Sequence, residues 1–337
     1  MPSFEGECVA SIDLGSHTAR LLISERVEGP GLLHPVARER AYIRLADGQN
    51  PGGMKVISPR AMGRALKALK TFVTIAEKYG VENIHTAATG IMRGATNRDE
   101  MLDLIFRETG IRPRVVTGEE EARLTARGVL NFLDPGTRPY RIFDLGGATT
   151  EFITGQRDVF QTMSLPLGAM TLTRECLFSD PPTNDEIEAL SEKVDGVLKG
   201  RLPGREATAD ALLVGTGGTV TTLGAMIHHI AIPDIRPEGM NGLTLEREAV
   251  EALFEVMKQM PNKERVLLDG LDRGRADVIL AGTLVVLRIM HIFQFPVLTI
   301  SMSDILEGIL IAALGSTKGD KQGGHEADFV PNHVGSQ

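Results

Sequence analysis

The chain of 337 residues is 42% hydrophobic and 24% charged, which is the balance of a soluble globular protein long enough for two domains. Its formal net charge of −8 disfavours a general nucleic-acid binder, and its most apolar run, 278–287, is too short to span a bilayer. Cys8 and Cys176 form no Cys-x-x-Cys motif, and the amino terminus, M-P-S-F-E-G-E-C, lacks the apolar core of a signal peptide. We therefore expect reduced cysteines, a cytoplasmic protein, and no nucleic-acid or membrane partner.

The first part of the chain alternates strands with helices. Apolar runs predict strands at 9–13, 21–26, 32–44, 84–88 and 113–117. Ser58 and Pro59 begin a long helix that Gly80 ends, and Asn97 with Glu100 resembles a capping box at the start of another helix. This alternation predicts an α/β layered domain.

A turn-rich stretch, 134–139, separates this part from a second domain. In this second domain, the apolar pattern predicts strands at 211–214 and 296–300. It predicts helices at 184–199, from the G-T-G-G-T motif to 229, at 246–260, at 275–293 and at 303–314. The remaining residues, 315–337, are rich in Gly, Lys, Asp and His and are expected to be disordered.

One short pattern occurs twice. Residues 12–23 read I-D-L-G-S-H-T-A-R-L-L-I, and residues 143–154 read F-D-L-G-G-A-T-T-E-F-I-T. Superposition pairs Asp13 with Asp144, Gly15 with Gly146, Thr18 with Thr149 and Arg20 with Glu151. Each copy predicts a β-hairpin with a small-residue turn, whose exposed N–H groups suit phosphate. Two such turns predict two related domains that face one ligand.

Candidate phosphate-binding residues lie in three turns: Ser16, His17 and Thr18; Gly146, Gly147, Ala148 and Thr149; and Gly217, Gly218 and Thr219. Small side chains let a phosphate approach the N–H groups, and the third turn adds a helix N-terminus. An ordinary strand-to-helix turn is the alternative for the third. Asp13 and Asp144 suit Mg²⁺ held directly or through water, because that ion prefers oxygen ligands. The alternative is that both are simple turn-forming residues.

Five motifs follow one another in the order D-L-G-S, A-T-G-I-M-R-G-A-T-N, G-E-E-E-A-R, D-L-G-G-A-T-T-E and G-T-G-G-T. From 9 to 314 the chain thereby resembles the exopolyphosphatase and guanosine pentaphosphate phosphohydrolase family. The resemblance implies the actin, sugar-kinase and heat-shock ATPase fold: α/β, with two ribonuclease-H-like domains, each a mixed five-stranded sheet with helices, around a central cleft. A carboxy-terminal helix would return to the hinge, which gives the expected domains 1–133 with 302–314, and 134–301.

The resemblance also assigns roles to acidic residues. Glu121, directly before Ala-Arg, would orient or deprotonate the attacking water. Glu151 would support the metal and the catalytic water, and the alternative for it is a surface cross-strand charge. Compensation of the helix dipole accounts for the neighbouring Glu119 and Glu120 without catalysis.

Arg93 closes the motif A-T-G-I-M-R and is carried over as a phosphate clamp, because a guanidinium can contact two phosphate oxygens. Arg20 is a weaker candidate for the same role. The implied activity is that of a Mg²⁺-dependent phosphoanhydride hydrolase. It would release terminal phosphate from inorganic polyphosphate, from guanosine pentaphosphate, or from both. A homodimer is left open.

The chain departs from the family pattern at several positions. His17 stands where Asn is usual, Ala148 where Gly is usual and Thr149 where Ser is usual, while Thr171 and Leu306 replace arginines common in relatives. The extra helical domain of longer members is also missing. We expect a lower affinity for long polyanions than in those relatives, and a preference for short polyphosphates or guanosine pentaphosphate. A sugar or acetate kinase of the same fold and a non-catalytic alarmone or polyphosphate sensor are the alternatives.

Overall fold

The computed structural model describes residues 6–26, 33–47, 55–157, 159–202, 210–315 and 332–333. Contacts divide the chain into two compact units, Met1–Asn131 with Asp304–Gln337, and Phe132–Ser303. We call them unit 1 and unit 2 and describe each by itself. The chain passes into unit 2 after Asn131 and returns to unit 1 at Asp304, and the domain limits expected from the sequence lie two residues away from these crossings.

Unit 1 is built on a mixed sheet. The first three strands, β1 (Cys8–Leu14), β2 (Thr18–Arg26) and β3 (Leu33–Tyr42), form an antiparallel meander at the positions where the sequence predicts strands. Strand β4 (Asn83–Ala88) runs parallel to β1, and β5 (Arg114–Val115) runs parallel to β4. A parallel strand beside a meander is the pattern expected of a ribonuclease-H-like domain.

A sixth strand, β12 (Asn332–His333), pairs antiparallel with β4, so the sheet has one strand more than the five expected. Disorder was expected here, and at these two residues that expectation is wrong. The side chain of Asn332 accepts a hydrogen bond from the Arg112 N–H at 2.8 Å and donates one to the Ile84 carbonyl at 3.1 Å. Apart from Gly315, the rest of the expected tail lies outside the described residues.

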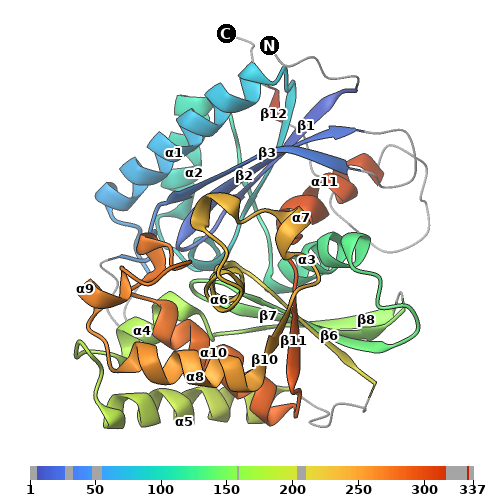
Figure 1. Cartoon of the computed structure of the whole chain (residues 1–337). Helices are drawn as coiled ribbons and strands as arrows, with labels where there is room; N and C mark the ends of the chain where they lie inside the picture. Colours follow the sequence, from blue (N-terminus) through green and yellow to red (C-terminus); the bar gives the residue numbers. More distant parts are fainter. Residues whose placement is uncertain are drawn as a thin grey trace. The chain divides into compact units, whose positions relative to one another are not determined.

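The described residues of unit 1 also form four helices and a short 3₁₀ turn: α1 (Pro59–Lys78), η1 (Gly90–Arg93), α2 (Arg98–Thr109), α3 (Gly118–Phe132) and α11 (Ile305–Gly315). Helices α1 and α2 lie on one face of the sheet, and α3 and α11 lie on the other (Figure 1). The hydroxyl of Ser58 caps α1, as predicted, by accepting from the Ala61 N–H. Asn97 does not cap α2 with its side chain, which instead bonds both backbone groups of Ile57.

Helices α3 and α11 cross in close contact because each has a glycine at the crossing. A Cβ on Gly128 would lie 1.8 Å from the Asp304 carbonyl oxygen, and a Cβ on Gly308 would lie 1.8 Å from that of Leu124. Both neighbours are backbone atoms, which cannot swing away as a side chain can. The crossing therefore fixes α3, which carries Glu121, against the first turn of α11.

Substituting either crossing glycine by alanine is expected to destabilise the protein by about 1–3 kcal/mol or more, because overpacking forces backbone shifts. Gly63 provides a matched control: it lies inside α1, and a Cβ there would meet nothing within 4 Å. We expect Gly63→Ala to stabilise by about 0.5–1 kcal/mol, since alanine is the better helix former. Urea unfolding of the three variants checks both signs. A stable Gly128→Ala or Gly308→Ala protein would show that the crossing can open without cost.

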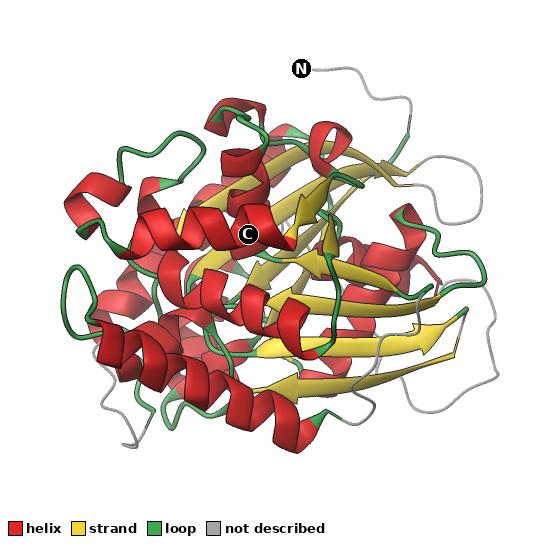
Figure 2. Ribbon diagram, turned by 60° about the horizontal axis from the view of Figure 1, so that its bottom comes forward, coloured by secondary structure: helices red, strands yellow, loops and turns green. Residues whose placement is uncertain are grey.

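Unit 2 repeats the strand pattern of unit 1. Strands β6 (Pro139–Leu145), β7 (Thr150–Gln156) and β8 (Val159–Leu165) form a second antiparallel meander, and β9 (Leu212–Thr216) runs parallel to β6. Two further strands complete the sheet: β11 (Val297–Ile300) pairs with β9, and β10 (Thr244–Glu246) pairs with β11 at the edge, so this sheet also has six strands. The strands are yellow in Figure 2. The structure thus confirms the internal duplication, whereas β8 and β10 were not predicted.

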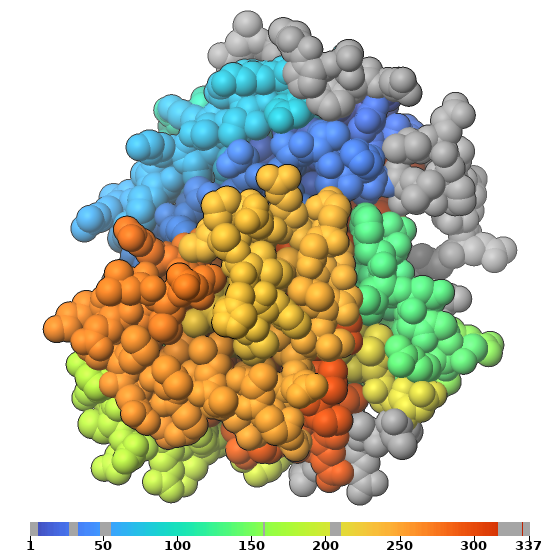
Figure 3. Space-filling model, in the orientation of Figure 1, coloured from blue at the N-terminus to red at the C-terminus, as the bar shows by residue number. Residues whose placement is uncertain are grey.

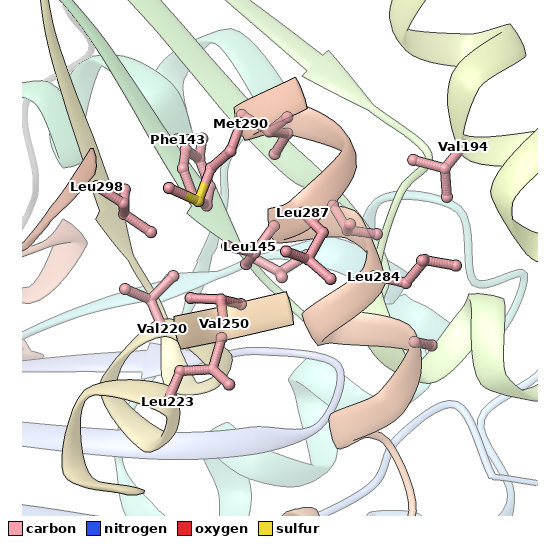
Figure 4. Packing of buried hydrophobic residues seen from close by; sticks show 14 of the residues in the cluster. Phe143, Leu145, Val194, Val220, Leu223, Val250, Leu284, Leu287, Met290 and Leu298 are labelled. Atoms are coloured by element: carbon pink, nitrogen blue, oxygen red, sulfur yellow. The ribbon is translucent and has the colours of Figure 1, made fainter. Parts of the chain in front are cut away.

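The helices of unit 2 are α4 (Ala169–Cys176), α5 (Asn184–Arg201), α6 (Gly218–Ile227), α7 (Pro237–Met240), α8 (Arg247–Lys258), α9 (Asn262–Arg265) and α10 (Ile279–Ile292), with 3₁₀ turns η2 (Ile232–Asp234) and η3 (Arg273–Arg275). Helix α10 contains most of the apolar run 278–287 and lies within the predicted helix 275–293, and eleven of its fourteen residues are buried. In Figure 4 its Leu284, Leu287 and Met290 lie in one cluster with Phe143 of β6. Helices α8 and α9 form an outer surface of this unit, orange in Figure 3. Across the described ranges, helices that combine the length and apolarity needed to cross a bilayer are absent.

Candidate active site

The two hairpins share one register. Asp13 lies opposite Arg20 across β1 and β2, and Asp144 lies opposite Glu151 across β6 and β7. The turns are closed alike, because the N–H of Gly15 donates to the Thr18 carbonyl at 3.0 Å and the N–H of Gly146 donates to that of Thr149 at 3.0 Å. This confirms the superposition drawn from the sequence. It also reveals a chemical difference: unit 1 sets a carboxylate against a guanidinium, and unit 2 sets two carboxylates against each other.

The first turn is fastened to the 3₁₀ turn η1. The Ser16 hydroxyl accepts a hydrogen bond from the Ile91 N–H at 2.8 Å, and the Thr89 hydroxyl donates to Asp13 Oδ1 at 3.2 Å. Gly90 has φ +57°, and a Cβ there would lie 2.2 Å from Ser16 Oγ, so a side chain would break this contact. The fastening fixes Arg93, the last residue of η1, relative to Ser16.

Two predicted site residues meet in unit 1. Arg93 Nη1 donates to Glu121 Oε2 in an ion pair, with 21% of the Arg93 side chain and 10% of that of Glu121 exposed. Glu121 reaches this position because it is the first acid of α3 to point inward. The guanidinium balances the charge of the carboxylate, which a base acting beside phosphate groups would need.

The other two acids of the G-E-E-E-A-R motif have separate places. Glu119 is exposed and lies 3.7 Å from Arg123, one helical turn away. Glu120 Oε2 accepts from the Thr117 N–H at 2.7 Å, and the Thr117 hydroxyl accepts from the Glu120 N–H at 3.1 Å, which is a capping box. Partial burial raises the pKa of Glu120, but the Thr117 N–H and Arg114 outweigh it and hold the pKa below its usual range. Both positions agree with the structural roles expected for these two residues.

Behind the first turn lies a buried network of charged side chains. Asp13 Oδ2 accepts from Arg20 Nη2 at 2.8 Å and from Nε at 3.1 Å, while Arg20 Nη1 donates to Asp304 Oδ2. The N–H of Asp304 donates to Glu307 Oε2 at 2.9 Å, and Arg38 Nη2 donates to Glu307 Oε1. The network joins three strands to the start of α11, and the sequence analysis assigned no role to Asp304, Glu307 or Arg38.

Three carboxyl groups and two guanidinium groups leave this network with an excess of negative charge. Burial raises the pKa of Asp13, and the charge and hydrogen bonds of Arg20 offset part of that rise. Burial likewise raises the pKa of Glu307, against the attraction of Arg38 and with the added repulsion of Asp304. An excess negative charge away from water favours uptake of a proton.

We predict a pH-dependent difference in stability between the wild type and Glu307→Gln. A carboxyl group whose pKa is higher in the folded protein binds protons on folding, so the free energy of unfolding falls as pH rises above the ordinary value of 4.5. Gln cannot titrate, so the wild type should lose stability relative to the variant between about pH 4 and pH 7. Urea unfolding of both proteins measures this difference, in which titrations elsewhere cancel. If the wild type instead became more stable relative to the variant as pH rises, the attraction of Arg38 would outweigh the effect of burial on the Glu307 pKa.

The second turn is braced by the start of α4. The N–H groups of Met170 and Thr171 donate to the Gly147 carbonyl at 2.9 and 3.1 Å, and a Cβ on Gly168 would collide with Ala148 at 2.1 Å. Beside the turn, Asp144 is 7% exposed and Glu151 is 1% exposed. Glu151 Oε1 accepts from the Ser164 hydroxyl at 2.7 Å. Glu151 is therefore no surface charge, and its carboxylate has a fixed orientation.

The third turn packs against Asp144. Gly217 has φ +93°, and a Cβ there would lie 2.8 Å from Asp144 Oδ1, so the turn can approach this carboxylate because the residue is glycine. The turn leads into helix α6. The first N–H groups of a helix have no acceptor within the helix and point out from its N-terminus. The side chain of Thr219 packs on Gly282 of α10, so its contribution to an anion site would come from its backbone N–H.

Sequence reasoning missed one basic side chain at this third turn. The guanidinium of Arg275 lies against Gly218, since a Cβ there would be only 1.7 Å from Arg275 Nη1. The backbone of Asp272 holds η3 in place by accepting from the Arg275 N–H at 2.8 Å. The sequence has two arginines, Arg273 and Arg275, shortly before the most apolar helix, but Arg275 was considered only as the first residue of a predicted helix.

Leu306, which replaces an arginine common in relatives, is accounted for by packing. It is 2% exposed and lies in an apolar cluster with Val9, Leu22, Leu33 and Leu310. This cluster fills the face of the unit 1 sheet that α11 covers. A leucine here stabilises the contact between α11 and the sheet.

The carboxylates of unit 2 are of the kind that fits Mg²⁺. Groups of three or more metal-binding side chains do not occur among the described residues, but Mg²⁺ is usually held by one or two carboxylates with water and substrate phosphates. Asp144 and Glu151, opposite each other on neighbouring strands, supply two carboxylates on one face of the sheet. Both oxygens of Asp13 already accept from Arg20 and Thr89. Direct ligation by Asp13 stays a prediction.

The fold and these turns define an α/β chain with a duplicated hairpin, in which each copy has an aspartate before a small-residue turn. Residues 22–317 match the Ppx/GppA phosphatase family. The chain is 32% identical to Exopolyphosphatase 2 of Mycobacterium tuberculosis over 321 residues, which cover 91% of this chain and 98% of the relative. It is 29% identical to the guanosine-5'-triphosphate,3'-diphosphate pyrophosphatase of Aliivibrio fischeri, covering 93% of this chain and 60% of the relative. The chain belongs to the Ppx/GppA phosphatase family.

Two solved structures support this assignment. An exopolyphosphatase from Cytophaga hutchinsonii matches with a TM-score of 0.82 at 26% identity, covering 92% of this chain and 98% of the other. The Aquifex aeolicus member of the Ppx/GppA family matches with a TM-score of 0.76 at 28% identity, covering 93% and 99%. These matches confirm the predicted fold, an α/β protein of the actin-like ATPase class with two mixed sheets.

Proposed function

We propose that this chain is a Mg²⁺-dependent hydrolase that releases terminal phosphate from inorganic polyphosphate, from guanosine pentaphosphate, or from both. Family membership and the named activities of the relatives support it, and they give no support to a kinase or a sensor. The structural observation that supports it most is the ion pair of Arg93 and Glu121 beside the first turn. It holds a buried carboxylate next to a side chain suited to phosphate.

Unit 1 would supply the groups that handle phosphate and water. An incoming terminal phosphate competes with the Glu121 carboxylate for the guanidinium of Arg93, since both are oxygen anions. The released carboxylate can accept a hydrogen bond from a water molecule and then its proton. The water oxygen attacks the terminal phosphorus in line, the bond from that phosphorus to the bridging oxygen breaks, and the electron pair leaves with the shortened chain.

Unit 2 would supply the metal site and further anion contacts. Asp144 and Glu151 would hold Mg²⁺, which when bound neutralises negative charge on the phosphate groups. The Ser164 hydroxyl keeps Glu151 oriented, and the N–H groups at the start of α6 with Arg275 offer a positive site for another phosphate oxygen. The same proposal places the enzyme in the cytoplasm, as a monomer or a homodimer, where the free thiols of Cys8 and Cys176 would stay reduced.

The test is phosphate release by the purified protein with Mg²⁺ and with excess chelator. Polyphosphates of several lengths and guanosine pentaphosphate are offered side by side, with ATP plus a sugar or acetate as a separate arm. We expect Mg²⁺-dependent release from at least one of the first two substrates. Phosphate transfer to the acceptor, or tight ligand binding without turnover, would overturn the proposal in favour of a kinase or a sensor.

A further inference from the structure

The segment before α1 is held beside the end of η1 by backbone contacts. The N–H of Thr96 donates to the Lys55 carbonyl at 2.9 Å. Two residues on, the Asn97 side chain accepts from the Ile57 N–H at 2.9 Å and donates to the Ile57 carbonyl at 2.9 Å. These bonds explain why Asn97 is not used as a helix cap. They fix the backbone of Lys55 next to the residues that follow Arg93.

The side chain of Lys55 lies over Gly94, the residue directly after Arg93. From the place that a Cβ on Gly94 would occupy, Lys55 Cδ is 3.3 Å away and Nζ is 3.7 Å away. Because Gly94 has no side chain, the aliphatic part of the Lys55 side chain can pack against it. The guanidinium of Arg98 contacts the same turn, with Nη1 donating to the Arg93 carbonyl at 3.3 Å.

The side chains of Lys55 and Arg98 thus both contact the turn at Arg93 and Gly94, and the charges of these two residues and of Arg93 are balanced differently. Arg93 pairs with Glu121, and Arg98 lies 3.4 Å from Asp99. Within the part of the chain that the structure describes, the Lys55 ammonium takes part in no ion pair. An ammonium group without an ion-pair partner gains Coulomb energy when an anion binds to it.

We infer that Lys55 is a substrate contact, which binds a phosphate of the chain beyond the one that is attacked. The inference rests on the proposed function, because Arg93 is taken to hold the terminal phosphate. A lysine on a flexible stem, with a compact charge, suits a phosphate whose position varies along a mobile chain, whereas a guanidinium suits one in a fixed place. Lys55 then offsets part of the affinity for polyphosphate that is lost because Thr171 and Leu306 replace arginines common in relatives.

The test compares kcat/KM of the wild type, Lys55→Gln and Lys55→Arg on tripolyphosphate and on polyphosphates of increasing length. We expect Lys55→Gln to lose about 3–10-fold on long chains, the usual range for an exposed to half-buried charge contact, and less on tripolyphosphate. The slope of log kcat/KM against log salt on long chains should fall by about 1, as for the loss of one phosphate contact. Lys55→Arg keeps the charge and should restore most of the activity.

Lys78→Gln is the matched control. It removes the same charge at the far end of α1, a helix of 20 residues and therefore about 30 Å long, from an exposed lysine. If Lys55→Gln and Lys78→Gln lowered kcat/KM equally, the effect would be one of net charge, and the inference would be overturned. A loss of kcat/KM in Lys55→Gln that did not depend on chain length would overturn it as well. If guanosine pentaphosphate is offered as well and Lys55→Gln loses more kcat/KM on it than on tripolyphosphate, Lys55 contacts the nucleotide. That result would overturn the assignment of Lys55 to a phosphate of the polyphosphate chain. An inactive wild type would instead remove the proposed function itself.

Discussion

Replacing Glu121 by Gln is expected to lower turnover by about 10²–10⁴-fold, the usual contribution of a positioned general base. Gln keeps the size of the side chain but cannot accept the proton of the attacking water. Substrate affinity should stay similar or increase, because the variant no longer competes with phosphate for Arg93. Steady-state phosphate release with thermal melts measures both effects.

Glu119→Gln and Glu120→Gln are the controls, since they share the start of α3 but not the contact with Arg93. Glu120→Gln weakens a capping box and an ion pair, so it should lower stability rather than turnover. If Glu121 did no more than compensate the helix dipole, its replacement would cost about 0.3–1 kcal/mol of stability and leave turnover intact. A folded Glu121→Gln protein with near-wild-type turnover would contradict the assigned role.

Replacing Asp144 by Asn, or Glu151 by Gln, is expected to weaken Mg²⁺ binding by at least about 10–100-fold, the loss seen when even an indirect partner of a metal is removed. Each substitution removes one of the two opposed carboxylates that would hold the ion. Calorimetric titration of Mg²⁺, or of Mn²⁺ as its spectroscopic substitute, measures affinity without relying on activity. Turnover at a fixed, limiting Mg²⁺ concentration should fall in parallel.

Glu192→Gln serves as the control for charge alone, because Glu192 is an exposed acid on α5 of the same unit. Asp13→Asn is informative in a different way. Since both oxygens of Asp13 accept hydrogen bonds in unit 1, its replacement should disturb Arg20 more than it disturbs metal affinity. Wild-type metal affinity in both Asp144→Asn and Glu151→Gln would show that the ion is held elsewhere.

Local sequence signals predicted the elements whose causes are local. The duplicated hairpins were predictable because apolar runs lie on either side of each Gly turn, and the structure gives both copies the same register. Helix α1 followed from Ser58 and Pro59 at its start, and α10 from its unbroken apolar run. The motif order then predicted the family and the fold.

The parts that sequence reasoning missed depend on contacts between distant segments. Strand β12 forms because Asn332 bonds backbone groups of two other segments, and Arg275 meets Gly218 from more than fifty positions away. The network around Arg20 likewise needs Asp304, which the fold brings back to the first sheet. One signal was available: Asp304 and Glu307 have the spacing of a capping box, and Glu307 does bond the Asp304 N–H.

The central claim is that water, positioned in unit 1, attacks the terminal phosphorus of a phosphoanhydride. Hydrolysis of short polyphosphate in ¹⁸O-labelled water tests it most directly, with mass spectrometry of both products. The account predicts Mg²⁺-dependent release of orthophosphate that carries one solvent oxygen per molecule, with no label in the shortened chain, and loss of this release in Glu121→Gln. Label in the shortened chain, or no phosphate release by the folded wild type from any of the proposed substrates, would contradict it.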